Sequence, residues 1–529
     1  MKHETILHKI AGCFFSIMIF FLLCLCIRSQ QPILLGNEII LLLFGLLFCL
    51  ISYLVVMAIP LFPKSRVILF HFLLGLSLLQ CYSIYLYYFH TGWDPGNIMS
   101  AAYCIAKGEP LEAWHLSYFS SYPNNSVILL IYAFLLRFGM WFQSEEQAYF
   151  GILVFQCLLS FVTELLLYLS VSKLCSKRLG VFSVLLYTLM VGFSPWLSIP
   201  YSDSLTLIIP IGVFALYLME VSSPVKRMAK WMLIGMIGYF GYRLKPQCII
   251  IVIAIVLLEG IHGVSALRKK KTAFSFAAGG SAFLSGILIC MLLHNLAVAK
   301  LPMETNSEEA FGMPHFFMMG LNTERRGGWF AEDVEFSASF STKEERNRND
   351  WIRAADRIQQ MGITGLIEHI KTKLQYTYDD GTFFWAGEGT FYRELLDKGD
   401  SPFSLFLKSL YYVDNIHVND YEQTGVRYWV WRTLAQGLWL AILSLCIFSG
   451  LSMWGNSDAL RRHTCVLLVS VIGLTLFEAI FEARSRYLFN YLPIYLILAA
   501  VGLKSISGII VSFVLQLENI KMRIFPSKE

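Results

Sequence analysis

Charge is scarce in this sequence. Only 15% of its 529 residues are Asp, Glu, Lys or Arg, whereas 56% are hydrophobic, and the mean hydropathy is +0.58. A soluble domain of this length needs far more polar surface, so the composition excludes a soluble enzyme or binding domain. The net charge of +5 says little about partners beyond the membrane, and we expect no nucleic-acid partner.

Several chemical motifs are also missing. The chain has no Walker pattern and no GxGxxG loop, so neither a nucleotide-sugar donor nor ATP is expected. The twelve cysteines include no CxxC pair, and almost all lie in apolar runs, which favours core packing over disulfides or a metal cage. The histidines are too scattered for zinc spacing, so no metal ligands are assigned.

Long apolar runs are what the sequence has in abundance. Because runs of about 18 or more residues recur, we predict an all-α polytopic membrane protein with about twelve transmembrane helices. The first run lacks an A-x-A cleavage site and is read as an uncleaved helix. The expected spans are 10–27, 39–59, 67–89, 149–172, 179–195, 204–221, 230–242, 246–260, 274–298, 429–453, 464–482 and 487–514.

The basic residues predict the orientation of these spans. If all basic clusters are cytoplasmic, twelve spans alternate without conflict and both termini lie in the cytoplasm. This holds only if the apolar segment 126–142 does not cross, so we expect it to lie in the outer interface. The alternative is an ordinary span with one basic loop on the wrong side. The clusters are Lys64 and Arg66; Lys173, Lys177 and Arg178; Lys226, Arg227 and Lys230; Arg268 to Lys271; Arg461 and Arg462; and Lys521 and Arg523.

The chain divides into four parts by composition. Two helices in 1–66 precede a transmembrane module at 67–299, whose outer loop is 90–125, and helices in 429–529 complete the bundle. The charged segment 300–428 is expected to be an extracytoplasmic helical insertion that caps the site, with a helix over 344–375. Spans 230–242 and 246–260 are expected to form a short hairpin whose tip barely reaches the outer surface.

Asp94 is the leading candidate for chemistry. It follows the third expected span, in the sequence GWDPG, where one side is wet and the other can hold a lipid tail. A carboxylate whose pKa is raised by a partly apolar setting can remove a proton from an attacking hydroxyl. The alternative is a helix cap or a turn former, since Asp-Pro-Gly is a good turn.

Other polar residues are expected on the same outer face. Asp203 follows Tyr201 between two spans and could face the site or cap the next helix. Cations there suit a phosphate leaving group, although single ones could instead anchor the protein to lipid headgroups. The cations assigned to the donor phosphate are Arg243, Lys245, Arg484 and Arg486.

Five further residues are assigned supporting or acceptor-binding roles. Glu482, next to Arg484, is expected to orient the late arginines, and Tyr487 lies in the same segment. Asp379 and Asp380 form either a turn or an acceptor site, where Trp385 could stack on a sugar.

These motifs together resemble the GT-C superfamily of membrane glycosyltransferases, in particular bacterial enzymes of the protein-mannosyltransferase and aminoarabinose-transferase type. The residues that carry the resemblance are GWDPGNIMSAA (92–102), YPNNSVILLIYAFLLRFG (122–139), KLCSKRLGVFSVLLY (173–187), PYSDS (200–204), GYRLKPQ (241–247) and EARSRYLFNYLP (482–493). The resemblance implies that Asp94 is the essential acid of the first outer loop and that Asp203 is the acid of the next outer loop. It also implies that Lys245 is the family's lysine of a later outer turn and that the Arg-x-Arg-Tyr segment contacts phosphate.

The resemblance also implies a reaction. It implies an inverting transfer of a sugar from a polyprenyl-monophosphate donor to an extracytoplasmic acceptor such as a cell-wall polysaccharide, teichoic acid, lipid-linked glycan or protein, at the bacterial cytoplasmic membrane. Pro95 and Gly96 stand where many members have a second acid, so a divalent cation, Mg²⁺ or Mn²⁺, is not favoured. The alternatives are a flippase or transporter of lipid-linked sugars and a polysaccharide polymerase or ligase.

Overall fold

The computed structural model describes residues 2–29, 34, 36–59, 65–266, 270–395, 401–414, 424–455 and 458–524. Within these ranges the chain is almost entirely helical, which confirms an all-α polytopic membrane protein. Lys64, Arg268 and Lys269 of the expected basic loops lie outside the described residues.

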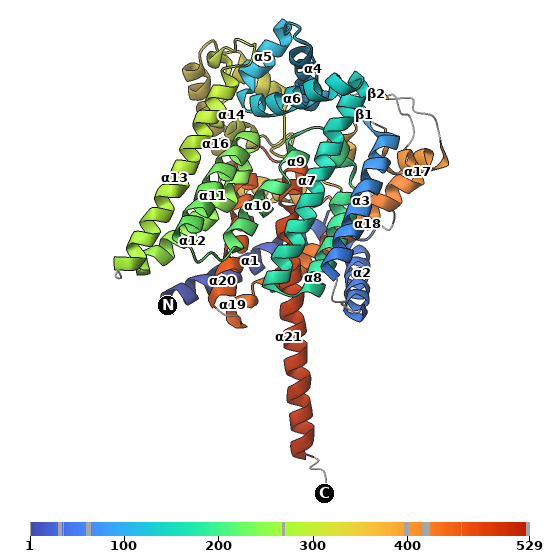
Figure 1. The fold of residues 1–529 in the computed structure, drawn as a ribbon, viewed down its shortest axis with the longest axis vertical. Helices are drawn as coiled ribbons and strands as arrows, with labels where there is room; N and C mark the ends of the chain where they lie inside the picture. Colours follow the sequence, from blue (N-terminus) through green and yellow to red (C-terminus); the bar gives the residue numbers. More distant parts are fainter. Residues whose placement is uncertain are drawn as a thin grey trace.

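Long helices form a bundle, and several of the shorter ones, among them α4, α5, α6 and α14, lie at its upper end (Figure 1). The long helices are α1 (Lys2–Ile27), α2 (Glu38–Ala58), α3 (Ser65–Tyr87), α7 (Glu145–Leu174), α11 (Pro224–Leu244), α12 (Ile249–Ala266), α13 (Lys270–Val298), α16 (Lys343–Tyr378), α18 (Val426–Ser449), α20 (Asp458–Ile480) and α21 (Leu492–Ile524). The others are α4 (Trp93–Lys107), α5 (Ala113–Ser121), α6 (Ser126–Phe142), α8 (Lys177–Tyr187), α9 (Ser202–Leu205), α10 (Ile208–Leu218), α14 (Met313–Gly320), α15 (Ala331–Ala338), α17 (Pro402–Tyr411) and α19 (Ser452–Gly455).

The expected number of spans needs correction. Ten described helices are long and apolar enough to cross a membrane, and they comprise nine of the twelve expected spans together with Pro123–Phe142. The expected span 179–195 ends early, because α8 passes into a π-helical turn at Thr188–Gly192. The expected span 204–221 is the shorter apolar helix Ser202–Leu218.

Helices α11 and α12 form the expected hairpin, but its first arm is longer than the expected 230–242. Helix α11 has 21 residues because it begins at Pro224, which needs no backbone N–H in the first turn, and therefore includes Lys226, Arg227 and Lys230. The basic residues in its first turns lower the hydropathy of that part of the helix. The prediction from the apolar run alone was therefore too short.

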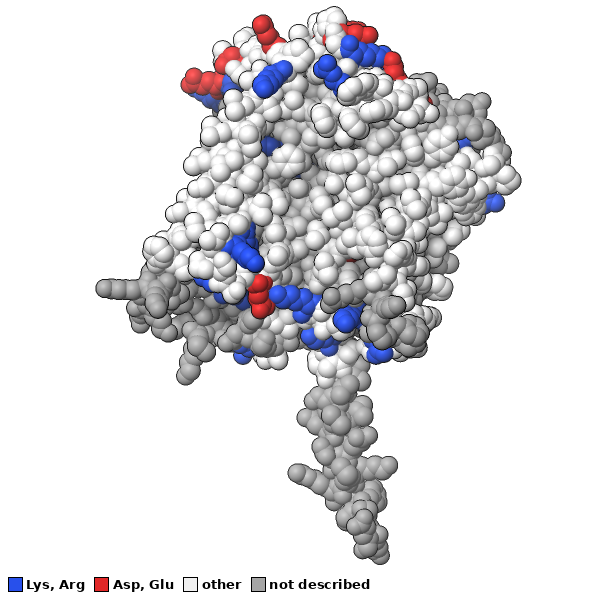
Figure 2. Space-filling view, in the orientation of Figure 1, with Lys and Arg blue, Asp and Glu red and all other residues white. Residues whose placement is uncertain are grey.

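The surface is divided into bands. Figure 2 shows a broad uncharged band between charged side chains at the upper and lower ends of the molecule, and Lys and Arg predominate at the lower end. An uncharged band of this kind is what a bilayer requires of the surface that faces it.

Helix α6 lies crosswise at the upper end of the bundle, beside α4, whereas its neighbour α7 runs along the bundle (Figure 1). Its length and composition would allow it to cross a membrane. Its observed direction instead agrees with the expected interfacial helix.

The segment 300–428 contributes α14, α15 and α16 to the upper end (Figure 1). The helix predicted over 344–375 is confirmed as α16, which is kinked at Gly362, where φ is +60°. The Lys373 ammonium is fully buried and donates to the carbonyls of Gly320 (2.9 Å) and Phe481. Lys373 therefore ties the end of α16 to the segment that leaves α20.

Two short strands were not expected. Strand β1 (Phe89–Thr91) pairs antiparallel with β2 (Tyr392–Leu395), 300 residues later in the chain. The Gly92 amide extends this connection by donating to the Phe391 carbonyl at 2.8 Å. The pairing fixes the start of the Asp94 loop against the segment that follows α16.

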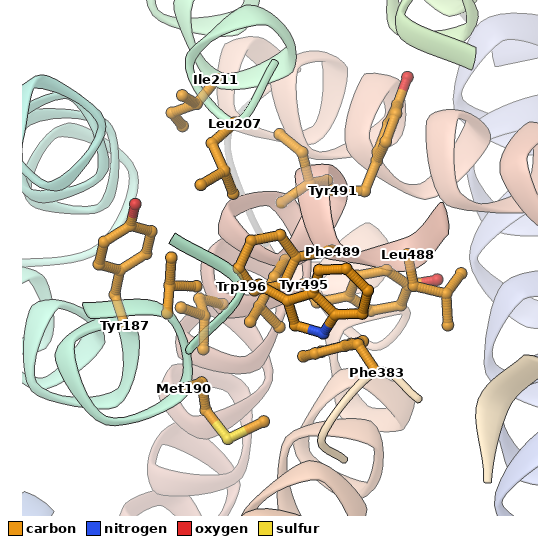
Figure 3. Packing of buried hydrophobic residues seen from close by; sticks show 14 of the residues in the cluster. Tyr187, Met190, Trp196, Leu207, Ile211, Phe383, Leu488, Phe489, Tyr491 and Tyr495 are labelled. Atoms are coloured by element: carbon orange, nitrogen blue, oxygen red, sulfur yellow. The ribbon is translucent and has the colours of Figure 1, made fainter. Parts of the chain in front are cut away.

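Beneath this connection lies an aromatic core. Figure 3 shows Trp196 close to Phe383, Phe489 and Tyr495. These four residues come from three parts of the chain that are far apart in sequence. The Phe383 and Phe489 rings meet edge to face at 5.5 Å, and the Trp196 indole donates to the Thr382 carbonyl at 3.1 Å. Edge-to-face ring pairs add specific geometry to the burial of apolar area. This core therefore gives the loops above it a rigid base.

Candidate active site

Asp94 lies in the first turn of α4, directly after β1. Trp93 adopts a positive φ of 46°, which turns the chain sharply between the strand and the helix. Gly96 permits this turn, because a Cβ atom there would stand 2.5 Å from the Thr91 carbonyl oxygen. The local sequence thus directs the Asp94 side chain towards the loops at the upper end of the bundle.

Two phenols hold the Asp94 carboxylate. The Tyr118 hydroxyl donates to Oδ1 at 2.8 Å, and the Tyr201 hydroxyl donates to Oδ2 at 3.0 Å. The Asn125 amide donates to the Tyr118 oxygen at 2.7 Å, so the first phenol is itself oriented. Each carboxylate oxygen can accept more than one hydrogen bond, so a third donor can still approach Asp94.

The surroundings of Asp94 favour its protonated form. Burial raises the pKa of Asp94 above its ordinary value, and the hydrogen bond from Tyr118, the Arg486 charge and the hydrogen bond from Tyr201 offset part of that rise. A carboxylate with a raised pKa is a stronger base than one in water.

A cluster of charged groups lies beside Asp94. Asp203 accepts hydrogen bonds from Lys245 and from Arg486 Nη1, the latter at 3.0 Å. Arg486 also contacts Glu388, with Nε 2.5 Å from Oε2, and Arg484 Nη1 lies 2.8 Å from Glu388 Oε1. Lys245, Arg484 and Arg486 are thereby gathered around two carboxylates.

Arg486 joins this cluster to the Asp94 group. Its guanidinium lies 4.5 Å from the Trp93 ring centroid and 5.4 Å from that of Tyr201, the residue that donates to Asp94. Cations over aromatic faces are attracted by the ring quadrupole. The base candidate and a fixed cation are therefore parts of one site.

Glu482 and Tyr487 complete the cluster. Glu482 Oε1 lies 3.9 Å from Arg484 Nε and accepts a hydrogen bond of 3.2 Å from the Tyr487 hydroxyl. Burial raises the pKa of Glu482, and the Arg484 and Arg486 charges oppose that rise. Lys245 lies 4.9 Å from the Tyr487 ring centroid, and burial lowers the pKa of Lys245 while Asp203 opposes that change.

The structure brings together most of the residues that the sequence singled out. Those that meet are Asp94, Tyr201, Asp203, Lys245, Glu482, Arg484, Arg486 and Tyr487. They come from four segments separated by up to several hundred residues.

Four expected residues are placed elsewhere. Arg243, in the last turn of α11, has no hydrogen bond or ion pair with any residue that the structure describes. Asp379 accepts a hydrogen bond of 2.7 Å from the Ser29 hydroxyl, which lies two residues beyond the end of α1. Asp380 accepts from the Thr382 amide at 2.8 Å within its own turn and lies 3.7 Å from Arg432.

Trp385 is fully buried, and its indole donates to the Tyr411 carbonyl at 2.8 Å. A ring enclosed in this way presents no face for stacking on a sugar. The position of Trp385 therefore does not support its expected acceptor role, whereas the acceptor role of Asp379 and Asp380 stays a prediction.

Three residues at the site were missed by sequence reasoning: Glu388, Tyr118 and Asn125. Glu388 lies in the π-helical turn Trp385–Gly389 and bridges both arginines. Its only sequence signal was the acid between two glycines in an aromatic stretch. Tyr118 and Asn125 lie within the outer loop 90–125, where nothing distinguished them from other polar loop residues.

The acids of the site are not arranged as a metal cage. Within the described ranges, no group of three or more His, Cys, Asp or Glu side chains could hold a metal ion. Asp94 accepts hydrogen bonds from two phenols, and Asp203 accepts them from two cations.

Comparisons with known proteins give two matches. A family model described as "conserved hypothetical integral membrane protein" matches residues 5–506. Among solved structures, the chain is similar to the crystal structure of ArnT from Cupriavidus metallidurans bound to undecaprenyl phosphate. The identity is 12% and the TM-score 0.33, covering 84% of this chain and 78% of that chain. No curated protein matches.

Proposed function

The chain belongs to the conserved hypothetical integral membrane protein family, and we propose that it is a membrane glycosyltransferase with Asp94 as its general base. In this proposal a sugar moves from a polyprenyl monophosphate to a hydroxyl of an extracytoplasmic acceptor. One observation carries the proposal: Asp94 and the Lys245, Arg484 and Arg486 cations share one site through Tyr201 and Trp93. A proton acceptor beside fixed cations is what transfer from a phosphate leaving group requires.

The proposed step is a single displacement. Asp94 takes the proton of the acceptor hydroxyl as that oxygen forms a bond to the anomeric carbon. The bond from this carbon to the phosphate oxygen breaks, and its electron pair leaves with the polyprenyl phosphate. Attack opposite the leaving group inverts the anomeric centre.

The cations stabilise the charge that develops on the phosphate. Arg486 and Arg484 offer planar donor pairs, and Lys245 acts as a point charge. All three already face carboxylates, which hold them in place before the donor arrives. Such preorganised charge in a site with little water is the largest catalytic contribution in many enzymes.

The proposed orientation places this site outside the cytoplasm. The Lys and Arg side chains that predominate at the lower end in Figure 2 support a cytoplasmic lower face. Helix α1 begins towards that end, and α21 extends beyond it (Figure 1). Both termini are then cytoplasmic, and the donor reaches the site from the outer leaflet.

The test is a release assay. Purified protein in detergent is given radiolabelled polyprenyl-monophosphate sugars with candidate acceptors, for the wild type and Asp94→Asn. We expect the wild type to release sugar from the carrier and the variant to lose about a hundredfold or more in rate, the usual contribution of a general base.

Normal turnover by a folded Asp94→Asn protein would contradict the assignment of the base. If the wild type releases no sugar from any donor but moves lipid-linked sugars across liposomes, the protein is a flippase. Activity only with diphosphate donors would instead indicate a polymerase or ligase.

A further inference from the structure

We propose that the lower end of the molecule carries a binding site for the headgroup of an anionic phospholipid. A cavity of about 1000 Å³ opens there between the end of α10, the start of α11, the end of α12, α13 and the start of α20. It is independent of the Asp94 site, since Lys230 and Lys245 stand 15 residues apart along α11, or about 22 Å at the rise of a helix.

One wall of the cavity is cationic and ordered. Lys230 Nζ donates to the carbonyls of Tyr217 and Met219 at 2.9 and 2.8 Å, which fixes the ammonium at the end of α10. Arg227 Nη1 donates to the Ser275 hydroxyl at 2.5 Å, which connects α11 to α13. Both side chains line the cavity and are held without the help of a carboxylate.

The acidic side chains of the cavity already form ion pairs with other basic residues. Glu259 pairs with Arg462 and accepts from the Tyr217 hydroxyl at 2.6 Å. Glu220 pairs with Lys173 at 3.0 Å. Arg227 and Lys230, by contrast, form no ion pair with any carboxylate in the described part of the chain. The cavity therefore has two cations without a counter-charge, which favours an anionic occupant.

The other wall is apolar. It includes Trp231, Val256, Phe276 and Phe283, and the last two flank Gly279 and Gly280, which leave space on α13. Val256 and Phe276 are 45% and 43% exposed, as expected of side chains that face lipid. A soluble anion would gain nothing from this wall, whereas an acyl chain would gain the burial of its methylene groups.

The geometry therefore favours one ligand: a phospholipid whose phosphate lies at Arg227 and Lys230 and whose chains follow the apolar wall. Basic pockets between membrane helices are a recognised means of binding acidic lipid headgroups. The cavity volume is at the upper end of the range for ligand sites, which suits a headgroup together with the first part of its chains.

The experiment measures lipid retention by native mass spectrometry. The full chain in detergent is titrated with phosphatidylglycerol and, separately, with phosphatidylcholine. We expect one saturable phosphatidylglycerol and at least tenfold weaker binding of phosphatidylcholine. Arg227→Gln should lower phosphatidylglycerol binding about tenfold, because it removes one cation from the headgroup site.

Lys226→Gln is the matched control, because it removes the same charge from the exposed neighbouring position, outside the cavity lining. A melting curve confirms that Arg227→Gln remains folded. Should that variant unfold, Ser275→Ala, which frees the guanidinium without removing its charge, is expected to weaken binding by a smaller factor.

Three results would overturn the proposal. Equal phosphatidylglycerol binding by the wild type and Arg227→Gln would show that Arg227 does not bind the lipid phosphate. Equal binding of both lipids would show a non-selective apolar groove. Displacement of the lipid by excess inorganic phosphate would show a site for a soluble anion. None of these results depends on activity at Asp94, so the glycosyltransferase proposal is tested separately.

Discussion

The two phenols that donate to Asp94 set how readily it can take a proton. A hydrogen bond to a charged carboxylate stabilises that charged form and lowers its pKa. Tyr118 and Tyr201 therefore oppose the rise that burial causes. The observed arrangement is a compromise, because a base must be unprotonated before the reaction and still hold a proton afterwards.

Replacing Tyr201 by Phe should move the acid limb of the pH–rate profile to higher pH. The lost hydrogen bond raises the pKa of Asp94 further, so a larger fraction is protonated and inactive at a given pH. Hydrogen bonds to charged groups contribute about 1.5–3 kcal/mol, so a shift of about one to two pH units is expected. The measurement is kcat/KM for sugar release across pH.

Tyr103→Phe serves as the control for this shift. Tyr103 lies in α4, the helix that carries Asp94, but its hydroxyl donates to the Glu145 carbonyl at 3.4 Å and not to Asp94. An unchanged acid limb in Tyr201→Phe, or an equal shift in Tyr103→Phe, would mean that Asp94 does not control the profile.

Glu388 is expected to be important for stability as well as for activity. Glu388→Ala would leave Arg484 and Arg486 facing each other with less counter-charge, and breaking a buried pair in this way costs about 3–5 kcal/mol. Glu388→Gln keeps the shape and one acceptor, so it should cost less. Thermal unfolding in detergent measures both, with exposed Glu335→Ala as the control. If Glu388→Ala unfolds like Glu335→Ala, Glu388 does not hold the arginines.

Sequence reasoning found the site residues whose place in the topology was unusual. Asp94, Lys245 and Arg486 follow apolar runs on one side of the bundle, and acids or cations at such places are informative. Glu388 and Tyr118 carry no comparable signal, because their role depends on partners from other segments. Arg243 shows the reverse error: its proximity to Lys245 in sequence suggested a shared site, yet the helix directs it elsewhere.

At the scale of elements, the start of α4 determines where Asp94 lies. The turn from β1 into α4 needs a residue without a side chain at Gly96, since a Cβ would meet the Thr91 carbonyl oxygen at 2.5 Å. That oxygen belongs to the backbone and cannot move without disturbing the β1–β2 pairing.

Gly96→Ala should therefore reduce sugar release at least tenfold by displacing the first turn of α4. The expected loss is in kcat, because the base moves while the cation cluster keeps its own contacts. Gly151→Ala in α7 is the matched control, since a Cβ there meets no atom within 4 Å. Normal kcat in Gly96→Ala would show that the turn tolerates the added atom and does not position Asp94.

The elements that could be predicted are those specified locally. Apolar runs identified most spans, and the spacing of apolar residues identified α16. The β1–β2 pairing could not be predicted, because three- and four-residue strands separated by 300 residues leave no local pattern. The length of α11 was underestimated because basic residues in its first turns interrupt the apolar run but not the helix.

At the scale of the whole molecule, a single orientation in the membrane, with the lower end in the cytoplasm, would account for the different charge of the two ends. The upper end shows both acidic and basic side chains, whereas Lys and Arg predominate at the lower end (Figure 2). Basic residues are retained on the cytoplasmic side of membrane proteins. The same asymmetry would bring the lower cavity to the level of cytoplasmic headgroups, which are rich in anionic lipid.

Cysteine labelling in whole cells tests this orientation. Glu109→Cys places a thiol on the exposed turn after α4 at the upper end, and Lys226→Cys places one on the exposed start of α11 at the lower end. A membrane-impermeant maleimide should label Glu109→Cys before lysis and Lys226→Cys only afterwards, with the wild type giving the background from native cysteines. The opposite result would place the Asp94 site in the cytoplasm. A cytoplasmic site would require a donor on the inner leaflet, so the proposed extracytoplasmic acceptors would then be wrong even if sugar release were measured.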